Sequence, residues 1–153
     1  MHRLLIGLII TGILACNDQA DTATERKNGF TPEIKTKEDS LYHDVMEGHD
    51  VGMAKIGKVR KYLDQSQQAL DSINKLPAAK TDTTYRRALT NLHEDLKYAD
   101  YSMNAWMEEF KVDSGTGNNE LRIQYLQSEK EKVNKVKEHI LRSLQRADSL
   151  FIK

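Results

Sequence analysis

The sequence predicts an all-α fold: an elongated, antiparallel, up-down-up three-helix bundle with a coiled-coil-like pattern. Apolar residues recur at alternate spacings of three and four in three long segments, as in helices with one apolar stripe. Short runs rich in Pro, Gly, Asn and Thr separate these segments, and no segment shows the alternation of a strand. With 39% hydrophobic residues among 153, the chain has material for one core, so we expect one domain.

Residues 1–15 have the organisation of a secretory signal. Arg3 precedes an apolar run of about twelve residues, which is the length of a signal-peptide apolar region and too short for a membrane-spanning helix. The sequence Ile13-Leu14-Ala15-Cys16 resembles the bacterial lipobox, which ends in the cysteine that becomes the lipidated N-terminus of the mature chain. We therefore expect cleavage before Cys16, with an ordinary cleaved leader or an uncleaved anchor as alternatives.

Cys16 is the only cysteine, so an intramolecular disulfide is excluded. A buried free cysteine is disfavoured because the next residues, Asn17 and Asp18, are polar. The lipobox resemblance implies a diacylglycerol and an amide-linked acyl chain on Cys16, and more than one chain makes membrane anchoring stable. We expect a lipid-anchored protein of the cell envelope. The outer membrane is favoured, with either its periplasmic face or the cell surface as the location.

Residues 16–36 comprise this cysteine and a polar, flexible linker. They show neither period 2 nor period 3.6, and a coil of roughly 20 residues spans on the order of 25 Å. The pattern Thr36-x-x-Asp39 has the form of a helix capping box, with Asp in place of Glu. The bundle is therefore expected over 37–153.

The first helix is expected over about 38–76, where Pro77 ends it. Its stripe, with period 3.5, consists of Val45, His49, Gly52, Ile56, Val59, Leu63, Ser66, Leu70 and Ile73. The glycines at 48 and 52 have the spacing that permits close helix packing.

The second helix is expected over about 82–111, with Thr81 or Asp82 as its cap. Its stripe runs from Tyr85 to Phe110 without a polar interruption. After a turn-forming run at 113–119, the third helix is expected over about 119–151. Its stripe runs from Leu126 to Leu150 and includes the charged residue Glu129.

Charge gives little indication of a ligand. The formal net charge is zero, and removal of residues 1–15 deletes only Arg3 among the charged residues. Such a chain lacks the basic surplus of a nucleic-acid-binding protein. The pairs Glu131/Lys135 and Glu138/Arg142 have i,i+4 spacing, and we interpret them as structural pairs on a solvated face.

One end of the bundle collects methionines. In the antiparallel hairpin of the first two helices, residues whose numbers add up to about 158 should face each other. This register gathers Met46, His49 and Met53 with Met103, Trp106, Met107 and Phe110.

Three interpretations of this cluster are open. His49, Met53, Met103 and Met107 form two i,i+4 pairs of soft ligands that suit Cu(I). Met46, Trp106 and Phe110 would line an apolar groove for a small molecule or a peptide. We favour simple packing, because methionine fills irregular core space such as that beside a glycine.

Three segments resemble a family of small lipoproteins from Bacteroidota, whose members often carry the automatic label "viral A-type inclusion protein". The segments are HDVGMAKIGKVRKYL at 49–63, ADYSMNAWMEEF at 99–110 and YLQSEKEKVNKVKEHI at 125–140. The resemblance implies an uncharacterised helical lipoprotein of a two-membrane cell envelope, and it implies no catalytic residues. The sequence departs from the family at Gly52 and Ala54, where bulkier or turn-forming residues are expected.

The sequence therefore predicts a membrane-anchored, non-enzymatic helical module that binds or scaffolds another envelope component. No catalytic constellation is recognisable, and the lipid on Cys16 is the only prosthetic group expected. The alternative function is a periplasmic soft-metal protein that binds Cu(I). The oligomeric state stays open, since a heptad stripe also suits pairing between chains.

Overall fold

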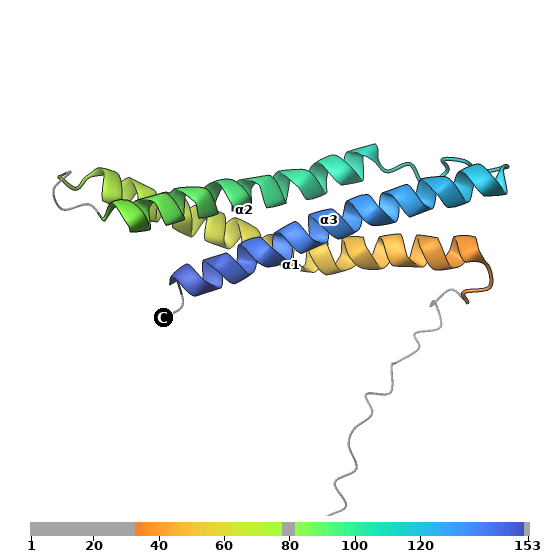
Figure 1. Ribbon diagram of the computed structural model, residues 1–153, viewed down its shortest axis with the longest axis horizontal. Helices are drawn as coiled ribbons and strands as arrows, with labels where there is room; N and C mark the ends of the chain where they lie inside the picture. The colour runs from red at the N-terminus through yellow and green to blue at the C-terminus, as the bar shows by residue number, and fades with distance from the viewer. Residues whose placement is uncertain (1–32, 78–81, 152–153) are drawn as a thin grey trace, which may run out of the picture. The chain divides into compact units, whose positions relative to one another are not determined.

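The computed structural model describes residues 33–77 and 82–151. They form three helices, α1 (Lys37–Asn74), α2 (Thr83–Glu109) and α3 (Asn119–Phe151), and each packs against the other two (Figure 1). The described ranges contain no strand. The prediction of an all-α three-helix bundle is confirmed, and the helix ends differ from the expected ones by at most two residues. The signal, Cys16 and most of the linker lie outside the described residues.

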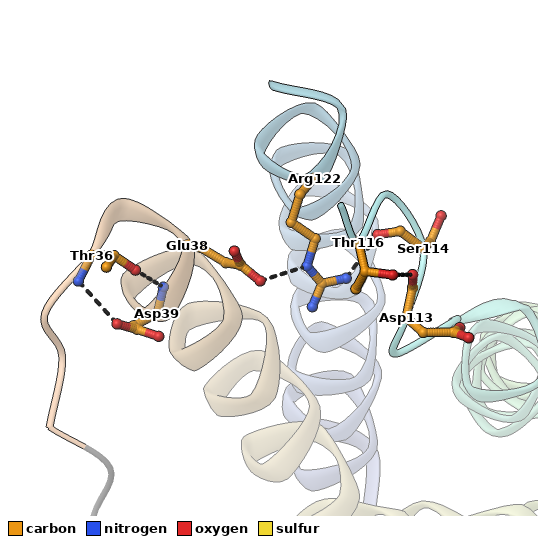
Figure 2. Close-up of polar contacts among 7 residues, drawn as sticks. All are labelled: Thr36, Glu38, Asp39, Asp113, Ser114, Thr116 and Arg122. Carbon is orange, nitrogen blue, oxygen red and sulfur yellow. Dashed lines mark hydrogen bonds and ion pairs between the residues drawn. The ribbon is translucent and has the colours of Figure 1, made fainter. Parts of the chain in front are cut away.

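Polar side chains fix where α1 and α2 begin. Thr36 and Asp39 form the capping box at α1, since the backbone N–H of Asp39 donates to Thr36 Oγ1 at 3.1 Å and that of Thr36 donates to Asp39 Oδ2 at 2.9 Å (Figure 2). Hydrogen bonds from Thr36 and from the backbone of Lys35 lower the pKa of Asp39. Of the two candidate caps of α2, Asp82 is the N-cap and accepts from the backbone N–H groups of Thr84 and Tyr85.

The core follows the predicted stripe closely in α2 and less closely in α1. The α2 residues predicted to face inward are buried from Leu89 to Trp106. In α1, Tyr62 is buried in place of Leu63, and Leu70 and Ile73 are only half-buried. Val45, Gly52, Val59 and Ser66, which are seven residues apart, are all buried, so the 3.5 repeat persists and the inward position between Val59 and Ser66 is three residues after Val59 instead of four.

Two glycines of α1 let the helices approach closely. A Cβ atom on Gly48 would lie 2.9 Å from Val133 Cγ1, and one on Gly52 would lie 2.3 Å from Met103 Cε. Both distances are too short for ordinary packing, so these positions require glycine or a shifted neighbour. The predicted close packing at these residues therefore joins α1 to both other helices.

Arg122 of α3 was not predicted as an interior residue, yet its side chain is only 7% exposed. Its Nε donates to Glu38 Oε1 at 2.9 Å and its Nη1 donates to the Ser114 carbonyl at 2.9 Å, so it joins α1 to the loop between α2 and α3 (Figure 2). In that loop Gly115 has a φ of 76°, which favours glycine, and a Cβ there would lie 2.8 Å from the Arg122 backbone nitrogen. The hydrogen bonds of the Arg122 guanidinium thus hold the first turn of α3 against α1 and the loop.

None of α1, α2 and α3, which are the helices of the described ranges, is long and apolar enough to cross a membrane.

Candidate functional site

The predicted register places α1 and α2 correctly at the methionine-rich end. The rings of His49 and Trp106 lie 5.7 Å apart between centroids, and His49 Nε2 lies 3.3 Å from Met107 Sδ. The other nitrogen, Nδ1, lies 2.8 Å from a carboxylate oxygen of the neighbouring Asp50. His49 is therefore held on both sides by side chains, and its own side chain is 20% exposed.

The four candidate Cu(I) ligands differ in their surroundings. His49 and Met107 are in direct contact. Met103 is completely buried in the core, with its methyl end against Gly52, and Met53 is 37% exposed at the surface of α1.

Trp106 has a buried polar partner that sequence reasoning missed. Its indole N–H donates to Glu129 Oε2 at 3.0 Å, and the Glu129 side chain is only 4% exposed. Lys132 Nζ donates to the other carboxylate oxygen at 2.8 Å, and this bond raises the pKa of Lys132. A buried carboxylate and a buried indole N–H both need a hydrogen-bond partner. Glu129 on an apolar stripe and the chain's only tryptophan were therefore the signal in the sequence for this bond.

Two of the three candidate groove residues, Trp106 and Phe110, pack against each other. The ring of Phe110 stacks on Trp106 at 5.0 Å and on Tyr125 of α3 at 6.1 Å between centroids. Met46 is half-buried on α1. Trp106 itself is only 5% exposed, so this end of the bundle consists of a row of rings that joins all three helices.

A serine and a histidine meet elsewhere in the core. Ser66 Oγ lies 2.9 Å from His93 Nδ1, a distance that a serine nucleophile and its base require. Ser66 is completely buried, however, and its hydroxyl donates to the Leu63 carbonyl at 2.7 Å. This pair is a satisfied core contact between α1 and α2.

A further cluster lies near the start of α1. His43, Asp44 and Glu47 each bring one potential metal ligand within 4.8 Å of the others. His43 and Glu47 are exposed, and Asp44 accepts a hydrogen bond from Lys130 Nζ at 2.7 Å. A surface cluster whose central carboxylate is already paired with an ammonium group resembles an ordinary solvated ion pair.

Comparisons of the chain with protein-family models, with curated proteins and with solved structures gave no match. The resemblance to small envelope lipoproteins therefore rests on the segments at 49–63, 99–110 and 125–140 alone.

Proposed function

We propose that this chain is a lipid-anchored, non-enzymatic binding or scaffolding module of a bacterial cell envelope, and a relative of the small Bacteroidota lipoproteins that it resembles. The observation that carries the proposal is the lipobox-like sequence Ile13-Leu14-Ala15-Cys16, directly after an apolar run of signal-peptide length. Lipid on Cys16 would hold the chain at a membrane, with the outer membrane favoured. An envelope component would be its partner.

The position of the helical domain along the chain supports this role. The first helix starts at Lys37, so roughly 20 residues separate it from Cys16, and such a linker spans on the order of 25 Å if it is flexible. A domain held in this way would meet its partner through the outer faces of its helices.

Fractionation of cells that produce the full chain tests the proposal. The wild-type protein is expected in the membrane fraction, and a Cys16→Ser variant is expected in the soluble fraction or as the uncleaved precursor. A Ser40→Ala variant, changed within the helical domain, serves as the control and should fractionate as the wild type. Equal membrane association of the Cys16→Ser and wild-type proteins, with the signal removed from both, would refute lipid anchoring.

One contact favours a second candidate function, the binding of Cu(I). Imidazole nitrogen and thioether sulfur suit this ion. His49 Nε2 and Met107 Sδ lie 3.3 Å apart, so both atoms can bind one metal ion, because metal bonds to N and S are about 2.0 to 2.3 Å in zinc sites. The two residues fit a soft-metal site. Met103 is enclosed in the core, so its side chain would have to move before its sulfur could act as a third ligand.

Titration with Cu(I) under reducing conditions tests this second function. The mature chain should carry Cys16→Ser, because a free thiol would bind the ion by itself. Tighter binding than that of a variant in which Met46, Met53, Met103 and Met107 are all leucine would support the site. Equal binding of Cu(I) by the two proteins would refute a Cu(I) site at these methionines.

A further inference from the structure

Two tyrosines stand out on the outer surface of α2. Tyr98 is 56% exposed and Tyr101 is 66% exposed, more than any other aromatic side chain of the described residues. They lie about one helical turn apart and line the same shallow hollow, together with Glu94 and Lys97. Single exposed apolar side chains are ordinary, but two neighbouring rings beside a hollow are typical of a binding surface.

A second hollow, of about 210 Å³, continues from Tyr98 onto α3. Its other lining residues are Ser102, Lys135, Val136, His139 and Arg142. We call the two hollows together the α2–α3 surface. Because residues 135, 139 and 142 have the spacing of one helix face, α3 contributes a row of polar groups opposite the tyrosines.

The cations of this surface have no partner in the described part of the chain. Lys135 and Arg142 make no ion pair there, although Glu131 and Glu138 precede them by four residues. The structural pairs expected from the sequence are therefore not formed, since exposed i,i+4 pairs gain too little to hold two long side chains together. Among the charged lining residues, Lys97, Lys135 and Arg142 outnumber Glu94. The residues that line the surface therefore carry a net positive charge, and Glu131 and Glu138 lie about one helical turn from Lys135 and Arg142.

His139 adds a neutral polar group between the two cations. Its Nε2 lies 3.2 Å from the Asp95 carbonyl, and its ring meets the Tyr98 ring edge-on at 4.8 Å between centroids. Burial, together with the nearby Arg142, lowers the pKa of His139. A neutral imidazole that donates through Nε2 presents Nδ1 as an acceptor, which suits a hydroxyl group.

We propose that the α2–α3 surface binds a glycan chain that carries carboxylate groups. An exposed tyrosine ring is electron-rich on its face, so it packs well against the C–H groups on the flat side of a sugar ring. Lys135 and Arg142 are about 10 Å apart along the helix axis, which matches carboxylates on alternate sugars of an extended chain. Arginine also binds a carboxylate through two parallel hydrogen bonds. The inference rests on the proposed binding role and names its ligand class.

Calorimetric titration of the mature chain, made soluble by Cys16→Ser, tests the proposal. The probe is hexagalacturonate, and its fully methyl-esterified form provides the same sugar rings without charge. We expect saturable binding of the acid that weakens as salt is raised, and binding of the ester that is weaker by about tenfold, as expected for the loss of two exposed charge contacts. Equal affinity for the acid and the ester, or no binding of the acid, would overturn the proposal. This comparison needs no substitution in the α2–α3 surface.

Matched variants locate the site. Lys135→Gln with Arg142→Gln should weaken binding by about tenfold, and Tyr101→Ala should weaken it severalfold. Lys55→Gln with Lys61→Gln removes two exposed cations of α1 and should leave binding unchanged. A loss in the control that equals the loss in the site variant would show nonspecific attraction and refute the assignment. The titration involves no membrane, so the absence of glycan binding would not count against lipid anchoring. In the same way, the absence of lipid anchoring would not count against glycan binding.

Discussion

Replacing Gly52 by alanine tests whether Met103 is a packing residue of the core. The exchange of Gly for Ala inside a helix adds about 1 kcal/mol of stability. The new methyl group would lie 2.3 Å from Met103 Cε, and an extra carbon forced into a packed core costs about 1 to 3 kcal/mol. We therefore expect Gly52→Ala to lower the free energy of unfolding by about 0 to 2 kcal/mol. Urea titration followed by the fluorescence of Trp106, the only tryptophan, measures this change.

Gly57 provides the matched control. Apart from its chain neighbours and the backbone of α1, a Cβ atom at this position would have no atom within 4 Å, so Gly57→Ala should raise the free energy of unfolding by about 1 kcal/mol. Met103→Leu shortens the side chain that meets the new methyl group, so in the double variant it should relieve part of the overpacking cost of about 1 to 3 kcal/mol. If Gly52→Ala stabilises the protein as much as Gly57→Ala does, the close approach of α1 and α2 at Met103 is wrong.

Three further predictions concern single residues. Glu129→Ala leaves the buried Trp106 N–H without an acceptor and should lower the unfolding free energy in urea by about 1 to 3 kcal/mol, whereas Glu129→Gln keeps an acceptor and should cost less. Asp82→Ala removes the cap of α2 and should cost about 1 kcal/mol in the same assay, with Thr83→Ala as a neighbouring control. Because the pKa of His139 is lower when folded than its ordinary 6.5, protonation favours the unfolded chain; stability should fall as the pH drops from about 7 to about 5, and less steeply in His139→Gln. An equally steep fall in that variant would assign the pH dependence to other groups.

The fold could be predicted because each helix carries its own apolar stripe and short turns join neighbouring helices. The second helix shows this best, since the predicted inward residues from Leu89 to Trp106 are all buried. The contact of His49 with Met107 could be predicted for the same reason, as a short turn fixes the register of an antiparallel hairpin. In α1 the alternation of four and three pointed to Leu63, but the inward step after Val59 is three residues, so Tyr62 lies in the core, where its ring stacks on Phe151.

Contacts that depend on the third helix could not be predicted. The register of α3 is set by the loop around Gly115 and by Arg122, whose partners Glu38 and Ser114 lie far away in sequence or within that loop. The bond from Trp106 to Glu129 and the hollow beside Lys135 both depend on this register. Periodicity gives the face on which a side chain lies and leaves open which residue of another helix it meets.

Mass spectrometry of the mature N-terminus tests whether Cys16 carries lipid. We expect residues 1–15 to be absent from the membrane-extracted protein and the first peptide to begin at Cys16, with the added mass of a diacylglyceryl group and an amide-linked acyl chain. A first peptide that begins at another residue, or an unmodified Cys16 within an intact N-terminal peptide, would contradict this expectation.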